Sequence, residues 1–220
     1  MIKAILFDLD ETLIDRAETM RRFLVAQHRI FPGLSGCTSA TFASICLSYQ
    51  DNGYADKQTA YTSACMALGV KNSSLAEKLY ADFKDRYGNE PVPFPDVSET
   101  LKLLRRKYRI GLVSNGRTKG QTAKINACGI SEFFSSICIS ESVGCKKPDA
   151  AIFQACLDEL SVQPNEAVFV GDNPIVDIEP AKKLGMFTVW VKNPHFPAPV
   201  ICDGIVTNIC ELPSVVAKLA

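Results

Sequence analysis

The stretch Phe7-Asp8-Leu9-Asp10-Glu11-Thr12-Leu13 follows an apolar run, residues 2–7, that is typical of a short buried strand. Side chains two residues apart on a strand share a face, so Asp8 and Asp10 are predicted to point the same way. Two carboxylates beside an apolar strand are costly to bury unless a cation neutralises them. A hard divalent ion such as Mg²⁺ would do so. For this motif alone, a turn-capping aspartate followed by a solvated one is the alternative.

The composition bounds the class of protein. The 24 basic and 24 acidic residues balance, which leaves no positive excess for binding nucleic acid or an anionic membrane. No apolar stretch is long enough to span a bilayer, and we expect no signal peptide because the first apolar run ends at Asp8. The nine cysteines form no CxxC pair and only two histidines accompany them, which argues against a zinc site. We therefore expect a cytoplasmic protein with reduced cysteines.

The part of the chain after the first motif has only helical patterns. Apolar residues recur at helical spacing in four segments, and Ser, Thr or Asp residues suited to cap a helix lie near their starts. The segments are residues 16–31, 38–49, 56–68 and 73–87. The stretch Pro91-Val92-Pro93-Phe94-Pro95 then forms a stiff extended connector. We interpret residues 16–91 as an inserted helical domain.

Strands and helices alternate in the remainder of the chain. Strands are predicted at residues 109–113, 136–140, 167–170, 187–191 and 204–206, and helices at residues 96–107, 118–128, 149–160, 174–184 and 214–219. This alternation predicts an α/β fold with a Rossmann-like parallel sheet covered by helices on both faces. Residues 1–15 and 92–220 would form this core domain.

Polar residues follow several of the predicted strands. Asp8 and Asp10 end the first strand, Ser114 and Asp172 end two later strands, and Lys147 lies in a loop before a helix. In parallel α/β sheets, ligands bind outside the carboxyl ends of the strands. A carboxylate pair, a hydroxyl, a lysine and a further acid at one edge favour a catalytic site over a chance Asp-x-Asp match.

The order of these motifs resembles the haloacid dehalogenase superfamily of hydrolases, which use an aspartate nucleophile. The four motifs of that superfamily are similar to Asp8-Leu9-Asp10-Glu11-Thr12-Leu13, Val113-Ser114-Asn115-Gly116, Lys147-Pro148-Asp149 and Gly171-Asp172-Asn173-Pro174-Ile175-Val176-Asp177. The inserted helical domain resembles the small α-helical cap of the family. The resemblance implies that this cap selects the substrate by closing over a shallow phosphate site.

The resemblance also implies roles for the acids. Asp8 would be the nucleophile that attacks phosphorus and forms an aspartyl-phosphate. Asp10 would protonate the leaving oxygen and later deprotonate the attacking water. Mg²⁺ would be held by Asp8, Asp172 and the backbone carbonyl of Asp10, and would cancel the repulsion between carboxylate and phosphate.

Four further residues complete the implied site. Ser114 and the backbone amide of Asn115 would bind phosphoryl oxygens, and Lys147 would neutralise nucleophile and phosphate together. Asp177 would act from outside these contacts by orienting Lys147 or a metal-bound water. Taken singly, Ser114 could be a turn residue and Asp177 could lie on a solvated helix face. Lys146 is assigned to solvent, because the motif lysine precedes proline.

We therefore predict a Mg²⁺-dependent phosphatase that hydrolyses a small phosphomonoester. The resemblance implies that dehalogenases of the family lack the acid at the position of Asp10, because a halide leaves without a proton. A phosphomutase or phosphotransferase on the same core stays open, as does a non-enzymatic phospho-acceptor switch. The partner would be a small phosphorylated metabolite: a nucleotide, a sugar phosphate or a molecule similar to phosphoglycolate.

Overall fold

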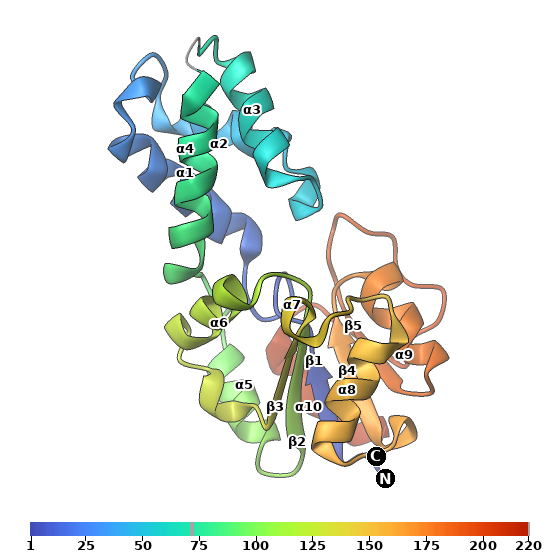
Figure 1. The fold of residues 1–220 in the computed structure, drawn as a ribbon. Coiled ribbons are helices and arrows are strands. Elements are labelled where there is room, and N and C mark those ends of the chain that lie inside the picture. Colours follow the sequence, from blue (N-terminus) through green and yellow to red (C-terminus); the bar gives the residue numbers. More distant parts are fainter. Residues whose placement is uncertain (71–72, 220) are drawn as a thin grey trace. The chain divides into compact units, whose positions relative to one another are not determined.

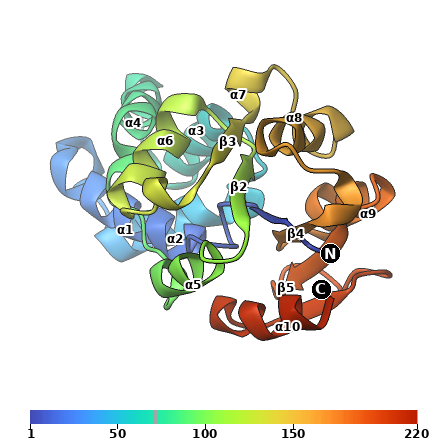
Figure 2. The ribbon, with the colours of Figure 1, turned by 90° about the horizontal axis from the view of Figure 1, so that it is seen from below.

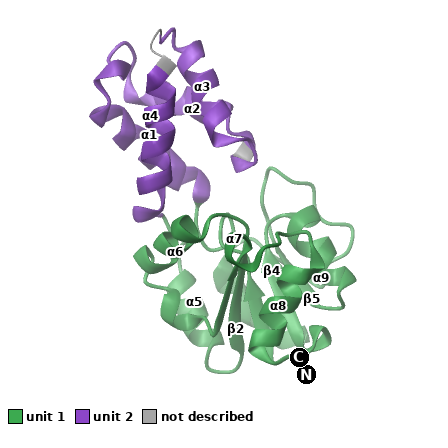
Figure 3. Ribbon diagram, viewed as in Figure 1, with its two compact units in different colours: residues 1–15, 92–220 green, residues 16–91 purple. Residues whose placement is uncertain are grey.

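The computed structural model describes residues 1–70 and 73–219, and the chain divides into two compact units (Figure 3). Unit 1 comprises residues 1–15 and 92–220, and unit 2 comprises residues 16–91. Within the described residues, no helix has both the length and the apolar character needed to cross a membrane.

Unit 1 is built on a parallel sheet (Figure 1). Over the described residues its six strands are β1 (Ala4–Phe7), β2 (Arg109–Ser114), β3 (Ser136–Ile139), β4 (Ala167–Gly171), β5 (Phe187–Val191) and β6 (Gly204–Val206). Their order is β3-β2-β1-β4-β5-β6, and every pair is parallel. The chain passes from β1 to β2 and β3, then returns to the other side of β1 for β4. The direction of winding therefore reverses at β1, and in such sheets ligands bind at this point.

Helices cover both faces of this sheet (Figure 2). The described helices of unit 1 are α5 (Val97–Leu104), α6 (Thr118–Ala127), α7 (Ser140–Val143), α8 (Ala150–Leu160), α9 (Glu179–Lys183) and α10 (Leu212–Leu219). Ile5 and Phe7 of β1 belong to the apolar cluster that includes α5 and α10. Ala4 and Leu6 belong to the cluster that includes α8. This alternation is the period of two of a strand buried on both sides, and it confirms the predicted Rossmann-like α/β fold.

Unit 2 is helical. Its helices are α1 (Arg16–Ile30), α2 (Ser39–Ser48), α3 (Lys57–Ala67) and α4 (Ser73–Arg86), each within two residues of the predicted segment. Thr38 and Asp56 cap α2 and α3, because their side chains accept hydrogen bonds from the backbone N–H groups of Thr41 and Thr59. The partly buried ring of Phe83 packs against the core and stacks on Tyr87 with 4.8 Å between centroids.

One predicted helix of unit 1 is irregular. The segment predicted as a helix over residues 174–184 begins as a π-helix, Pro174–Ile178, and continues as α9. Pro180 has no backbone N–H, so the carbonyl of Val176 cannot receive an ordinary α-helical bond from it. The Asn173 side chain accepts bonds from the backbone N–H groups of Ile175 and Val176 and so fixes the start of this turn.

The tight packing at β2 can be tested with a glycine pair. Replacing Gly111 by alanine is expected to destabilise unit 1, because the new Cβ would lie 2.6 Å from Cys156 Sγ. Overpacking of this kind costs about 1–3 kcal/mol of unfolding free energy. Gly120 on α6 has open space around it, so alanine there should add up to about 1 kcal/mol. Urea unfolding followed by the fluorescence of Trp190, the single tryptophan, measures both variants. A Gly111→Ala variant as stable as the parent would contradict this packing.

Candidate active site

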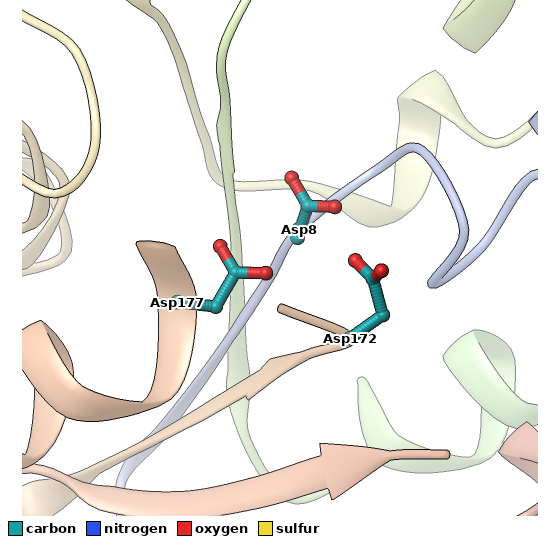
Figure 4. Close-up of side chains that lie close together, drawn as sticks. All are labelled: Asp8, Asp172 and Asp177. Carbon is teal, nitrogen blue, oxygen red and sulfur yellow. The ribbon is translucent and has the colours of Figure 1, made fainter. Parts of the chain in front are cut away.

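Three carboxylates gather at the carboxyl ends of the two central strands (Figure 4). Asp8 follows β1 and extends its pairing with β4, since its backbone N–H donates to Val170 O at 2.9 Å. Asp172 follows β4, and Asp177 lies on the π-helix. All three residues are buried, and each offers a carboxylate oxygen within 4.8 Å of the others.

Lys147 is the cation that joins two of these acids. Its Nζ donates to Asp8 Oδ1 at 2.5 Å and to Asp177 Oδ1 at 2.7 Å, and its side chain is only 2% exposed. The Asn115 side chain holds the backbone of Lys147 from both sides. Its Oδ1 accepts from Lys147 N at 2.8 Å, and its Nδ2 donates to Lys147 O at 2.9 Å. Asn115 therefore fixes the loop that delivers the lysine.

Burial disfavours the ionised forms of the carboxyl groups in this cluster. Desolvation, together with Asp177, raises the pKa of Asp8 to about 7 although Lys147 opposes the shift. Desolvation, together with Asp177 and Asp8, raises the pKa of Asp172 to about 8. Burial also opposes the charge on Lys147, but the two acids outweigh it and hold its pKa above the ordinary value. When all three carboxylates are ionised, one lysine leaves two negative charges uncompensated within the cluster.

This surplus tests whether the residues fit a divalent cation. Buried carboxylate oxygens are the hard ligands that Mg²⁺ prefers, and a charge of two matches the surplus. Asp172 is also held in place, since its Oδ2 accepts from Asn193 Nδ2 at 2.7 Å and its backbone carbonyl accepts from Trp190 Nε1 at 2.6 Å. The donor set therefore fits a divalent metal ion.

The carboxylate of Asp10 contacts two residues of helix α6. Its Oδ1 and Oδ2 accept from Lys124 Nζ at 2.6 and 2.9 Å, and its Oδ2 also accepts from Gln121 Nε2 at 3.0 Å. β1 ends at Phe7, so strand alternation does not extend to Asp8 and Asp10, and the expectation that their side chains point the same way stays a prediction. The implied metal contact of Asp10 concerns its backbone carbonyl and stays a prediction.

The structure brings Ser114 to the same edge. It is the buried last residue of β2, and its Oγ accepts from Gln121 Nε2 at 2.7 Å. Sequence reasoning did not select Gln121 or Lys124. Both are buried on α6 three residues apart, beside the core residue Ile125. A glutamine and a lysine at helical spacing beside an apolar core position are the signal that could have identified them.

Comparisons with known proteins place the chain in a family. Residues 5–191 match the model of the haloacid dehalogenase-like hydrolases. The chain is 28% identical to N-acylneuraminate-9-phosphatase of Mus musculus over 99% of this chain and 95% of the relative. It is 34% identical to glyceraldehyde 3-phosphate phosphatase of Methanopyrus kandleri over 87% and 84% of the two chains. A solved HAD phosphatase from Thermococcus onnurineus has a TM-score of 0.71 at 25% identity, covering 98% of both chains.

The fold and the buried acidic centre define a Rossmann-like α/β protein with an acidic candidate active site. The chain belongs to the haloacid dehalogenase-like hydrolases, which confirms the resemblance inferred from its four motifs. The phosphatases among its relatives support a hydrolase of phosphoric monoesters, as predicted.

The raised pKa values predict how Mg²⁺ should stabilise the fold. A carboxyl group whose pKa is higher in the folded than in the unfolded state favours the fold while it is protonated. The metal-free protein therefore loses this contribution progressively as the pH rises from the ordinary pKa of 3.8 through the folded pKa values of about 7 and about 8. Mg²⁺ must displace these protons at low pH but not at high pH. We expect it to raise the melting temperature by a few degrees at about pH 9 and by less at about pH 6.

Differential scanning fluorimetry with Mg²⁺ or with chelator measures this difference. Asp172→Asn should lose most of the Mg²⁺ effect, whereas Asp158→Asn, on the exposed part of α8, should keep it. Equal stabilisation at both pH values, or full stabilisation of Asp172→Asn, would contradict metal binding by these acids.

Proposed function

We propose that this chain is a Mg²⁺-dependent phosphatase that hydrolyses a small phosphomonoester through an aspartyl-phosphate on Asp8. The observation that carries the proposal is the contact of Lys147 with Asp8 and Asp177 beside Asp172. It holds a carboxylate at the switch point of the sheet, within a cluster whose surplus charge suits a divalent ion.

In the first step an oxygen of Asp8 attacks phosphorus, and the bond between phosphorus and the ester oxygen breaks. Asp10 gives a proton to the departing alkoxide and is left ionised. In the second step Asp10 takes a proton from water as the water oxygen attacks phosphorus. The bond between phosphorus and Asp8 then breaks, which regenerates the carboxylate and releases phosphate.

The other site residues stabilise charge during these steps. Lys147 contacts the nucleophile and would neutralise the incoming phosphate, while Asp177 orients the ammonium group. Ser114 and the backbone amide of Asn115 would bind phosphoryl oxygens. Asp8, Asp172 and the backbone carbonyl of Asp10 would hold Mg²⁺, which supplies the positive charge that lets two anions meet.

The alternatives differ in what they require. A dehalogenase needs no proton donor for its leaving group, yet here Asp10 is present and held by Lys124. A phospho-acceptor switch needs no acid at that position and no inserted helical unit. A phosphomutase or phosphotransferase would use the same core, and the phosphatase names of the curated relatives favour water as the acceptor.

The proposed substrate is a small phosphorylated metabolite, and we assign its selection to the helical unit. The relatives are, by their names, an N-acylneuraminate-9-phosphatase and a glyceraldehyde 3-phosphate phosphatase. We also propose a cytoplasmic location, since all nine cysteines are free thiols, as is typical of a reducing compartment.

The nucleophile can be tested directly. Asp8→Asn should lower Mg²⁺-dependent hydrolysis of p-nitrophenyl phosphate at least about a thousandfold, because the amide cannot attack phosphorus. Chelator should abolish the activity of the parent, and fresh Mg²⁺ should restore it. The control Asp158→Asn should retain full activity. A parent that does not turn over, but keeps a stable acyl-phosphate from a small phosphodonor, would support the switch instead.

Substrate selection is tested with a panel of phosphorylated metabolites. The panel should contain N-acylneuraminate 9-phosphate, glyceraldehyde 3-phosphate, phosphoglycolate, hexose phosphates and nucleoside monophosphates. We expect kcat/KM for the best substrate to exceed the panel median more than about tenfold, because differential transition-state binding sets specificity. Rates within about tenfold across the whole panel would mean that the helical unit does not select.

A further inference from the structure

Helix α6 carries two buried polar residues, Gln121 and Lys124, that have no role in the mechanism above. The side chain of Lys124 is 4% exposed, and its Nζ lies 2.6 and 2.9 Å from the two oxygens of Asp10. A buried ion pair adds little net stability, because desolvation offsets the attraction between the charges. A lysine in this position therefore needs a reason other than stability alone.

Gln121 extends the contact to the predicted phosphate-binding residues. Its Nε2 donates to Asp10 Oδ2 at 3.0 Å, to Ser114 Oγ at 2.7 Å and to Asn115 O at 3.2 Å. An amide nitrogen has two hydrogens, so these three acceptors share them. A single side chain thus ties the carboxylate of Asp10 to the end of β2.

The geometry of Asp10 suits proton transfer. Its carboxylate is hydrogen-bonded to residues of α6, while its side chain remains 22% exposed. A leaving group or a water molecule can therefore still reach Asp10. Proton transfer requires the acid within hydrogen-bond reach of the reacting oxygen, and a misplacement of about 1 Å costs about a hundredfold in rate. Lys124 contacts both oxygens of Asp10 and so fixes the rotation as well as the position of the group.

We propose that Lys124 is a positioning residue for proton transfer by Asp10, and that Gln121 aligns Asp10 with Ser114. This inference rests on the proposed phosphatase function. In this proposal, α6 holds the proton donor Asp10 at a fixed position relative to Ser114, the phosphate-binding residue at the end of β2. Removing Lys124 should therefore damage the steps that move a proton and spare the step that does not.

Esters with different leaving groups separate these steps. A nitrophenolate leaves without a proton, whereas the alkoxide of glycerol 2-phosphate needs one. For Lys124→Met we expect kcat/KM to fall about a hundredfold with glycerol phosphate and less than about threefold with p-nitrophenyl phosphate. With the aryl ester, kcat and KM should fall together, because hydrolysis of the aspartyl-phosphate becomes slow. Stopped-flow absorbance should then show a burst of nitrophenolate close to one equivalent of enzyme.

Three variants show whether Lys124 acts through Asp10. Lys124→Arg keeps the charge and the donors and should restore glycerol phosphate hydrolysis to within about threefold of the parent. Adding Lys124→Met to Asp10→Asn should cause no further loss, since residues that act as one unit are not additive. Lys102→Met, at an exposed position of α5, should behave as the parent.

Equal losses with both esters, or additive losses in the double variant, would show a merely structural lysine and overturn the inference. Thermal unfolding identifies variants that fail to fold. In that case Lys124→Gln, which retains a donor in the buried position, carries the same comparison of esters. Turnover of p-nitrophenyl phosphate by the parent tests the proposed phosphatase separately, so failure of the positioning role can be distinguished from failure of the phosphatase function.

Discussion

The structure depends on one buried ammonium group shared by two carboxylates. Lys147 contacts Asp8 and Asp177 where water is excluded, so removing the lysine would leave the carboxylates without a counter-charge in the interior. The surrounding elements maintain this contact. Pairing of β1 with β4 brings Asp8 beside Asp172, the π-helix carries Asp177, and Asn115 fastens the Lys147 backbone. The sheet, six-stranded in the described residues, thus holds the ammonium group of Lys147 within hydrogen-bond distance of two acids, Asp8 and Asp177, that come from separate segments of the chain.

Much of this arrangement could be predicted because it follows from strand ends. Apolar runs identify β1, β2 and β4, and in the observed order these three strands are adjacent. The residues at or just after the carboxyl ends of adjacent parallel strands lie at the same edge of the sheet. Asp8, Ser114 and Asp172 could therefore be placed together before any contact between them was known. Lys147 precedes proline and is buried, while Lys146, predicted to face solvent, is exposed. The local sequence pattern was enough to predict these positions, because the direction of the backbone decides where the residues after each strand lie.

The parts that escaped prediction depend on side-chain direction after regular structure ends. The alternation of side chains along β1 ends at Phe7, so it does not set the directions of the side chains that follow. After this point Asp10 contacts Lys124 of α6. A lysine on a helix usually lies in solvent, so Lys124 gave no sign of burial by itself. Its burial follows from packing of α6 through Ile125 into the core, a tertiary fact. The π-helix likewise combines a missing donor at Pro180 with a side-chain cap from Asn173.

The two buried lysines are used in opposite ways. Lys147 is shared between acids in a cluster that keeps surplus negative charge, and such a cluster attracts a cation. Lys124 contacts the carboxylate of Asp10 and opposes its negative charge. Had Asp10 turned into the cluster as a fourth carboxylate, it would have competed as a ligand and been less available for proton transfer. In the proposed mechanism, separation of the two pairs on different elements would let one edge of the sheet bind a metal ion and move a proton at the same time.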